Sequence, residues 1–320
     1  MLFYFILFII TFFGVIGYFR LADKYNIIDK PNERSSHSSI TIRGGGVAYL
    51  IAGLVFGFYN GFAMPWFWLG FVIIATLSFV DDVKTLSSKF RLPLQFLAVL
   101  LLVYQGLASE TPVWIWGVAI ILATGIINAY NFMDGVNGIT AGYSLVVLLS
   151  LLLINQSIVF IDDQFIVTFI IADVVFGFFN FRKKAKCFAG DVGSVSIAFV
   201  IVFLLLKLIM LSGNIFYILL LSVYGVDSVL TIIYRLRKRE NIFEAHRSHL
   251  YQWLVNPGPF SHLQITGIYM IVQAAISLGI YLLADANAEV QILYALVTLG
   301  FLAVMYISIK RDYKRKYGLV

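Results

Sequence analysis

Long apolar runs divide almost the whole chain, and they constrain its fold more than any other feature. A helix needs roughly 20 apolar residues to cross a bilayer, and continuous rather than alternating apolar residues favour helices over a β-barrel. Only 12% of the residues are charged, whereas soluble domains carry about 25%. The first run lacks the basic start and cleavage site of a signal peptide, so we expect a retained helix. We predict an all-α, polytopic integral membrane protein that forms one domain over residues 1–320, with eleven spans at about 1–20, 44–63, 65–80, 92–107, 113–130, 139–155, 164–180, 194–211, 215–234, 263–283 and 289–309.

Lysine and arginine are distributed unevenly between the two sides of this predicted bundle. If the first connection is cytoplasmic, every basic residue except Lys207 falls on the cytoplasmic side. Basic loops are retained in the cytoplasm during membrane insertion, so we expect the N-terminus outside and the C-terminus inside. We expect the lipid bilayer, and no nucleic acid, to face these basic loops. The opposite side carries only acidic charges, at Glu110, Asp162, Asp163, Asp285 and Glu289.

Five polar segments between the apolar runs hold most of the reactive side chains. An even number of predicted crossings separates any two of them, so we expect all five on the cytoplasmic face. This arrangement indicates an active site at one membrane surface, built from loops at about 21–43, 81–91, 128–138, 181–194 and 235–262. The segments are PNERSSHSSITIRGGG (31–46), DDVKTLSSKFR (81–91), NAYNFMDGVNG (128–138), CFAGDVGS (187–194) and EAHRSHLYQ (244–252).

Two adjacent carboxylates, Asp81 and Asp82, end the third run. A helix C-terminus disfavours anions because it is the negative end of the helix dipole. A divalent cation would offset this cost, and so would the nearby Lys84, Lys89 and Arg91. The sequence therefore leaves two explanations open, a metal-binding pair and a solvated loop.

Polar side chains also recur at every third position where the fifth run ends. Asn128, Asn131 and Asp134 share one face if the helix continues through them. Gly135 and Gly138 would then allow the backbone to approach a ligand closely. Because NG and DG pairs by themselves indicate turns, the alternative is a turn without a binding function.

Asp191 lies between two glycines, directly before the eighth run. Small residues at a helix N-terminus expose backbone N–H groups, an arrangement that suits phosphate. Phe188, three residues earlier, is either an ordinary interfacial aromatic residue or a stacking platform for a base.

Cationic side chains occur in the first and last polar segments. His246, Arg247 and His249 combine imidazole and guanidinium groups that suit a diphosphate. Zinc is disfavoured because no third ligand lies in the usual local pattern. Arg43 precedes three glycines, which favour either anion capture or close packing of helices. A solvated basic loop is the alternative reading of the histidine segment.

Two further carboxyl groups, Asp173 and Asp227, lie inside apolar runs. Carboxylates in hydrocarbon are costly and face protein or water. Asp227 is placed to line the floor of the site, whereas Asp173 is equally compatible with a structural partnership.

Together, these segments resemble the polyprenyl-phosphate N-acetylhexosamine-1-phosphate transferase family, of the glycosyltransferase family 4 type. The resemblance extends from about Pro31 to Gln252, with DD after a helix, NxxNFMDGxxG, FxGDxGS and a late histidine loop in the family's order. The HRSHLYQ form is more similar to the O-antigen-initiating branch than to the peptidoglycan-precursor branch, whose loop carries three consecutive histidines.

The resemblance implies Mg²⁺-dependent transfer of a sugar-1-phosphate from a UDP-activated amino sugar to undecaprenyl phosphate, with release of UMP and with Mn²⁺ tolerated. It places the enzyme in a bacterial inner membrane, facing the cytoplasm, at the start of a cell-envelope glycan such as the O-antigen of lipopolysaccharide. A homodimer is compatible with it. The sugar stays open among N-acetylglucosamine, N-acetylgalactosamine and 6-deoxy sugars, as does the choice between direct attack and a covalent aspartyl intermediate.

The resemblance also implies roles for individual residues. Asp81, Asp82 and Asp191 are the expected catalytic residues, and Asp191 and Asp82 are the expected Mg²⁺ ligands. Phe188 is expected to stack on uracil and the histidine loop to bind the diphosphate. The complete set of expected substrate-binding residues is Arg43, Asn128, Asn131, Asp134, Asn137, Phe188, His246, Arg247 and His249.

Two other classes of protein compete with this reading. A multi-helix transporter of an anionic substrate would keep its polar site near the midplane, often on broken helices in repeats. Here the polar groups lie at the ends of the runs and no repeat is evident, which favours an enzyme. A membrane scaffold that binds acidic partners would not need carboxylate clusters.

Overall fold

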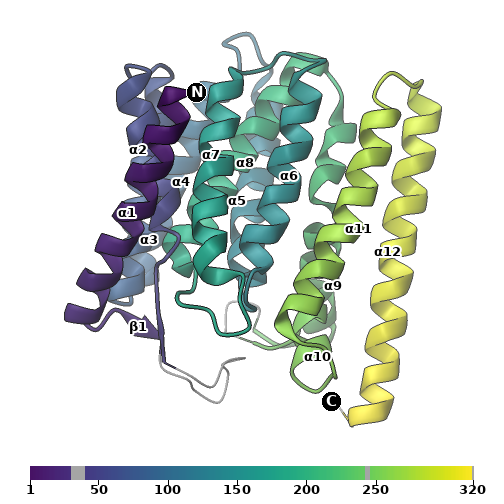
Figure 1. Cartoon of the computed structure of the whole chain (residues 1–320). Coiled ribbons are helices and arrows are strands. Elements are labelled where there is room, and N and C mark those ends of the chain that lie inside the picture. The colour runs from purple at the N-terminus through teal and green to yellow at the C-terminus, as the bar shows by residue number, and fades with distance from the viewer. Residues whose placement is uncertain (30–39, 242–245, 319–320) are drawn as a thin grey trace.

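The computed structural model describes residues 1–29, 40–241 and 246–318, and it is 77% helical. Its helices run side by side as a bundle, and the two termini lie at opposite ends (Figure 1). Within the described residues, eight helices are long and apolar enough to cross a membrane, which confirms an all-α integral membrane protein. The helices are α1 (Leu2–Lys24), α2 (Val47–Tyr59), α3 (Pro65–Val83), α4 (Ser88–Gly106), α5 (Val113–Met133), α6 (Ile139–Asn155), α7 (Asp163–Asn180), α8 (Gly190–Ser212), η1 (Ile215–Leu221), α9 (Ser222–Arg237), α10 (Leu250–Val255), α11 (His262–Leu282) and α12 (Ala288–Tyr317).

Each of the eleven predicted runs coincides with helix, but the boundaries differ. Two of the helices, α2 and α6, are shorter apolar helices of 13 and 17 residues. The ninth run begins as the 3-10 helix η1 and continues as α9, after Gly213 ends α8 in a left-handed conformation. Helix α12 has 30 residues and passes the predicted end at 309, because Lys314, Arg315 and Lys316 favour a helix C-terminus.

The central helix of the bundle is α8. It packs against α2, α3, α4, α5 and α6, and 72% of its most apolar stretch is buried, the largest share among the candidate spans of the described residues. A helix that is apolar on all sides is buried on all sides. Asp191, in its first turn, is therefore held by the most rigidly packed element of the molecule.

A short antiparallel pair of strands, absent from the sequence prediction, tethers the first polar segment to α8. Strands β1 (Ile28–Asp29) and β2 (Thr41–Ile42) pair with Ile28 opposite Ile42, and Ile42 also bridges Cys187. A Cβ on Gly46 would lie 2.1 Å from the Cα of Gly193. The glycines that follow Arg43 thus permit close backbone packing against α8, one of the two explanations left open. Arg34 and His37 of this segment lie outside the described residues.

Candidate active site

Asp82 caps the N-terminus of α8. Its Oδ1 accepts a hydrogen bond from the backbone N–H of Asp191 at 2.9 Å, and its Oδ2 accepts one from Val192 at 2.9 Å. The first N–H groups of a helix have no partner within it and carry partial positive charge. Arg43 adds its Nε at 2.7 Å from Asp82 Oδ1. The unfavourable position of this carboxylate at the end of α3 is therefore offset by a second helix and an arginine.

This cap changes two expectations from the sequence. The backbone N–H groups of Asp191 and Val192 bind Asp82 rather than standing free for a phosphate. Both oxygens of Asp82 are engaged, and its side chain is 0% exposed. A role for Asp82 as a metal ligand stays a prediction, whereas its role in positioning Asp191 is evident from the contacts.

Asp191 presents its own carboxylate to the outside. Its Oδ1 accepts from Asn131 Nδ2 at 3.1 Å and lies 3.6 Å from an Nη of Arg43. Its Oδ2 has no hydrogen-bond partner among the described residues, and the side chain is 22% exposed. Mg²⁺ retains water and takes only one or two protein carboxylates besides phosphate oxygens. An outward carboxylate oxygen of this kind fits that requirement, although no group of three or more His, Cys, Asp or Glu side chains within the described residues could form a metal cage.

Asp81 is held in the turn between α3 and α4. Its Oδ1 accepts from the backbone N–H of Leu86 at 2.7 Å, and its Oδ2 lies 2.9 Å from an Nη of Arg91. Of the basic residues considered from the sequence, Arg91 is thus the one that pairs with this carboxylate. The pair keeps both an acid and a guanidinium next to the cluster of Asp82, Asp191 and Arg43.

The three polar residues at the end of α5 do not line one face of that helix, as the sequence had suggested. Asn131 joins the cluster and also contacts Ser194 Oγ at 3.2 Å. Asn128 instead donates to the carbonyl of Thr124 in its own helix. The helix ends at Met133, so the condition for placing Asp134 on the same face is not met; Asp134 accepts a bond from Thr140 Oγ1 at 2.6 Å.

Electrostatics near the cluster follow from burial and from the excess of acids. Burial raises the pKa of Asp134 to about 7, and nearby Asp191 and Asp82 add to the shift while Thr140 and Arg43 oppose it. Burial lowers the pKa of Arg43, but Asp82 and Asp191 outweigh burial and raise it overall. Arg43 is consequently a permanent cation between two acids.

Phe188 and Asn137 are fixed differently. The backbone of Phe188 pairs with Ile42 and Gly45, and the residue is half-buried. Asn137 is 5% exposed, and its Nδ2 donates to the carbonyls of Arg182 and Lys183. Asn137 thus joins the loop that follows α5 to the loop that follows α7. Its binding to substrate stays a prediction.

The histidine segment faces the end of α5. The rings of His246 and His249 stack at 5.0 Å, and each ring centroid lies 6.4 Å from that of Phe132. Phe132 and Asn131 both belong to the last turn of α5, so the histidine segment and the acidic cluster meet the same end of this helix. Residues 244 and 245 of the segment lie outside the described residues, and the backbone carbonyl of Arg247 accepts a bond from Trp253 Nε1.

The two imidazoles have different surroundings. His249 is 2% exposed, its Nδ1 lies 3.2 Å from Asp227 Oδ1, and its buried Nε2 has no hydrogen-bond partner among the described residues. The N–H of Ser248 donates to Nδ1 of His246, which leaves the proton of a neutral ring on Nε2. Burial, with nearby His249, Arg235 and Lys310, lowers the pKa of His246 to about 3. His246 is therefore a neutral donor at physiological pH.

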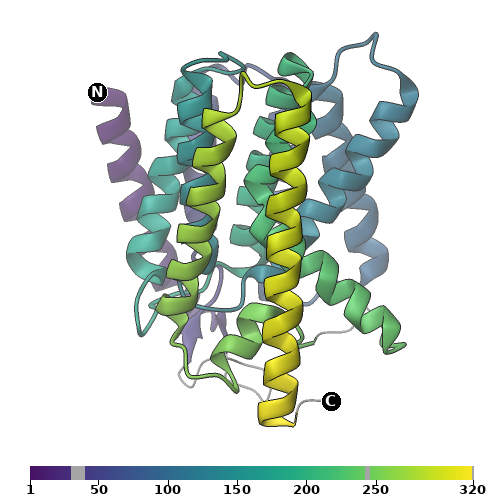
Figure 2. The same ribbon diagram turned by 90° about the vertical axis from the view of Figure 1, so that its right-hand side faces the viewer.

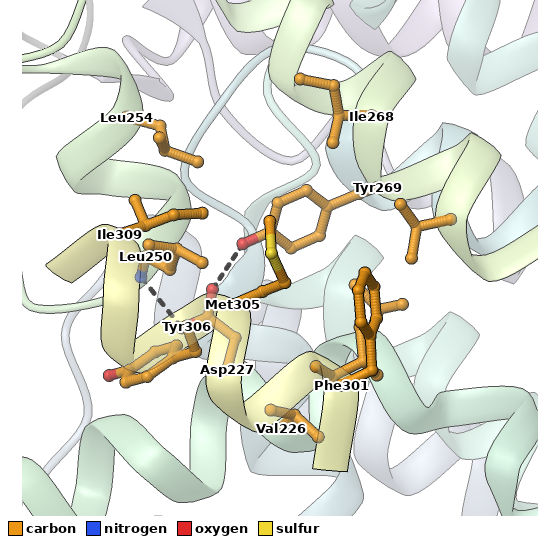
Figure 3. A pocket seen from close by; sticks show the side chains of 13 residues that line it. Val226, Asp227, Leu250, Leu254, Ile268, Tyr269, Phe301, Met305, Tyr306 and Ile309 are labelled. Atoms are coloured by element: carbon orange, nitrogen blue, oxygen red, sulfur yellow. Dashed lines mark hydrogen bonds between the residues drawn. The ribbon is translucent and has the colours of Figure 1, made fainter. Parts of the chain in front are cut away.

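Asp227, whose role the sequence left open, anchors this segment. Its carboxylate accepts bonds from Tyr269 Oη at 2.7 Å and from the N–H of Leu250 at 3.0 Å, besides its contact with His249 (Figure 3). The one signal in the sequence was a carboxyl group inside an apolar run. The other such group, Asp173, accepts a bond from Tyr49 Oη at 2.5 Å in the buried contact between α7 and α2, a structural partnership.

Comparisons with known proteins identify the family of this chain. The family model for glycosyl transferase family 4 matches residues 64–209. The chain is 30% identical, over 79% of its length and 76% of the relative, to the probable undecaprenyl-phosphate N-acetylglucosaminyl 1-phosphate transferase of Bacillus subtilis. It is 26% identical to the decaprenyl-phosphate N-acetylglucosaminephosphotransferase of Mycobacterium tuberculosis, over 85% of this chain and 79% of the relative. It is 23% identical to the undecaprenyl-phosphate alpha-N-acetylglucosaminyl 1-phosphate transferase of Escherichia coli K12, over 92% of this chain and 87% of the relative. The chain therefore belongs to glycosyl transferase family 4, among its polyprenyl-phosphate hexosamine-1-phosphate transferases.

Proposed function

We propose that this protein transfers N-acetylhexosamine-1-phosphate from a UDP-sugar to undecaprenyl phosphate and releases UMP. The observation that carries the proposal is the junction of an outward carboxylate, a permanent cation and a histidine pair at one end of the bundle. Asp191 contacts Arg43 and Asn131, and His246 and His249 lie against Phe132 in the same last turn of α5. A site that must bring two phosphate-bearing substrates together needs such opposed charges.

The chemistry balances without an oxidant or reductant. An oxygen of the lipid phosphate attacks the phosphorus that carries the sugar, and a new P–O bond forms there. The bond between this phosphorus and the oxygen bridging to the uridine side breaks, and UMP leaves with that oxygen. Catalysis of this kind is mostly positioning and charge stabilisation.

The residues divide this work by position. Asp191, with its free Oδ2, is the proposed ligand of a Mg²⁺ ion, which when bound would neutralise negative charge on the phosphates. Asp82 holds the start of α8, and therefore Asp191, in place. His246, through its Nε2–H, and His249 are the proposed ligands of the diphosphate, and the ring of Phe188 is proposed to stack on uracil. The Nε2 of His249 is buried, so it would have to become accessible when the diphosphate binds. Asp81 accepts or orients a proton of the lipid phosphate once it has released its ion pair with Arg91.

We further propose eleven membrane spans with the site facing the cytoplasm of a bacterial inner membrane. Support comes from the one-sided distribution of Lys and Arg and from the polar loops that gather near the C-terminal end of the bundle (Figure 1). Ser87 and Ser157 are both exposed and are expected on opposite sides. Cysteine at Ser87 should react in intact cells only with membrane-permeant reagents, and cysteine at Ser157 also with impermeant ones. The reverse pattern would contradict the orientation.

An assay of purified protein tests the reaction. We would incubate it with undecaprenyl phosphate, Mg²⁺ and a panel of UDP-sugars and measure UMP. Because the curated relatives are named for N-acetylglucosamine, UDP-N-acetylglucosamine is the first substrate expected to give UMP, with the O-antigen role and other amino sugars to follow. Absence of UMP with every sugar, together with uptake of an anionic solute into vesicles, would favour the transporter instead.

A further inference from the structure

Three buried charged side chains surround the histidine segment, and none belongs to the five polar segments. Asp227 and Arg235 are each 3% exposed and Lys310 is 5% exposed. Asp227, Thr231 and Arg235 are spaced four residues apart on α9, so they lie on one face of that helix. Buried charges are costly unless they are paired and hydrogen-bonded, so their partners indicate what they stabilise.

Each charge holds a different point of the chain between α9 and α10. Arg235 binds the start, with Nε 3.0 Å from Glu240 Oε2 and an Nη 2.6 Å from the carbonyl of Asn241. Asp227 binds the end, through His249 Nδ1 and the N–H of Leu250. Lys310 binds one residue before this end, because its Nζ donates to the carbonyl of Ser248, which lies between the two histidines in the sequence.

Lys310 is enclosed by aromatic rings. Its Nζ lies 4.6–4.7 Å from the ring centroids of Tyr234, Trp253 and Tyr306 and 2.5 Å from Tyr306 Oη. Rings attract a cation through their negative faces. Thr231 Oγ1 connects this cage to the other anchor, at 2.8 Å from Tyr306 Oη and 3.2 Å from Asp227 Oδ1.

Apolar side chains border this network next to Asp227. An apolar pocket of about 130 Å³ lies beside Asp227 between α9, α11 and α12, and Phe301, Met305 and Ile309 line it (Figure 3). The long α12 runs the length of the bundle and ends near α10 (Figure 2). Hydrogen bonds at low dielectric are stronger and their loss costs more, so the network fixes geometry more firmly than surface contacts would.

We propose that Lys310 is a positioning residue of the active site. From α12 it fixes the Ser248 carbonyl and, together with Asp227, sets the orientation in which His246 and His249 meet the diphosphate. This inference rests on the proposed function of the histidine pair. Lys316, an exposed basic residue of the same helix, lies over the single ring of its neighbour Tyr317 and serves as the natural comparison.

Paired variants test the proposal. Lys310→Met keeps the length of the side chain but removes the charge and the donor, and Lys316→Met is the matched control on the same helix. We expect Lys310→Met to increase hydrogen exchange of the backbone amides from 246 to 251 and to lower kcat/KM for the UDP-sugar about 100-fold, as misplacement by about 1 Å does. KM for undecaprenyl phosphate should not change. Lys310→Arg, which keeps the charge, should recover part of the loss, and Lys316→Met should match the wild type.

The outcomes separate this inference from the proposed function. Unchanged amide exchange and kinetics in Lys310→Met would overturn the positioning role. If the wild type released no UMP from any UDP-sugar, the proposed function would fail, while the exchange measurement would still decide whether Lys310 holds the segment. If Lys310→Met destabilised the whole bundle, Thr231→Val would replace it, since it removes the bonds of Thr231 Oγ1 to Tyr306, Asp227 and the Ser248 carbonyl without removing a charge. Thr231→Val should raise exchange at 246–251 to a smaller extent, and no rise there would overturn the proposal.

Discussion

The two halves of the site are held in opposite ways. In the acidic half, the residues of the polar segments bind one another: Asp82 and Arg43 contact each other, and Asp191 contacts Arg43 and Asn131. In the histidine half, the anchors come from outside the polar segments, from the α9 face and from α12. The acidic half stands on the most buried helix of the bundle, whereas the histidine half is a connection between two helices.

This difference predicts different consequences of substitution. A change in the acidic half removes a charge from a scaffold that α8 keeps in place, so it should act on the chemical step. A change in the histidine half or in its anchors alters the imidazole groups, their positions or both. It should therefore act on substrate affinity as well as on kcat.

Asp191→Asn should have the largest effect. The amide retains the bond with Asn131 but loses the charge that a Mg²⁺ ligand needs. We expect UMP release to fall by about 10³-fold or more, the order found when a charge-stabilising group is removed, with an unchanged Tm. Asp285→Asn, at an exposed acid near the other end of the bundle, is the matched control. A variant with wild-type rate and wild-type Mg²⁺ dependence would show that the metal lies elsewhere.

His249→Ala should come next and should affect two parameters. The variant loses the buried Nε2 and frees Asp227 from its contact with the ring. We expect kcat to fall about 100-fold and KM for the UDP-sugar to rise. His246→Ala should have a smaller effect on kcat, because its ring is a neutral donor, whereas the ring of His249 lies against the Asp227 carboxylate. Equal effects of the two substitutions would refute the special position of His249.

Phe188→Ala should act on binding alone. Loss of one stacking contact with a base is worth roughly 1–3 kcal/mol, or about 5- to 150-fold in affinity. We expect KM for the UDP-sugar to rise within this range, with little change in KM for the lipid. Phe178→Ala, which removes an exposed ring on α7, is the control for a general loss of aromatic packing. An effect on the lipid KM instead would place Phe188 against the other substrate.

Asp134 provides the smallest expected effect, on stability rather than rate. Its pKa is raised from an ordinary 3.8 to about 7, so the folded protein holds the proton more tightly than the unfolded chain. The resulting stabilisation is complete below pH 3.8 and is lost as pH rises to about 7. In EDTA, the Tm of Asp134→Asn relative to the wild type should therefore increase between pH 4 and pH 8, by about 2 °C per kcal/mol. A difference independent of pH would mean that Asp134 titrates normally.

The sequence predicted the site well where the residues that contact one another all belong to the polar segments. The apolar runs predicted the helices because helices in a bilayer satisfy their own backbone, and the segment motifs predicted the cluster around Asp191. The cap by Asp82 was not predictable, since it depends on where the end of α3 meets the start of α8. Lys310 was counted only as a basic residue near the C-terminus, because nothing in its local sequence reveals three rings contributed by α9, α10 and α12.

The cap of Asp82 on α8 also bears on the order in which the substrates and the metal bind. The helix end that would attract a phosphate already holds an internal anion. When ionised, Asp81, Asp82 and Asp191 carry three negative charges, and the arginines that contact them, Arg43 and Arg91, carry two positive charges. Without a cation, these five residues are therefore net negative and disfavour a diphosphate beside them. The divalent cation is therefore expected to bind first or together with the nucleotide sugar. A nucleotide that lacks the sugar should likewise bind more tightly when the cation is present than when it is absent.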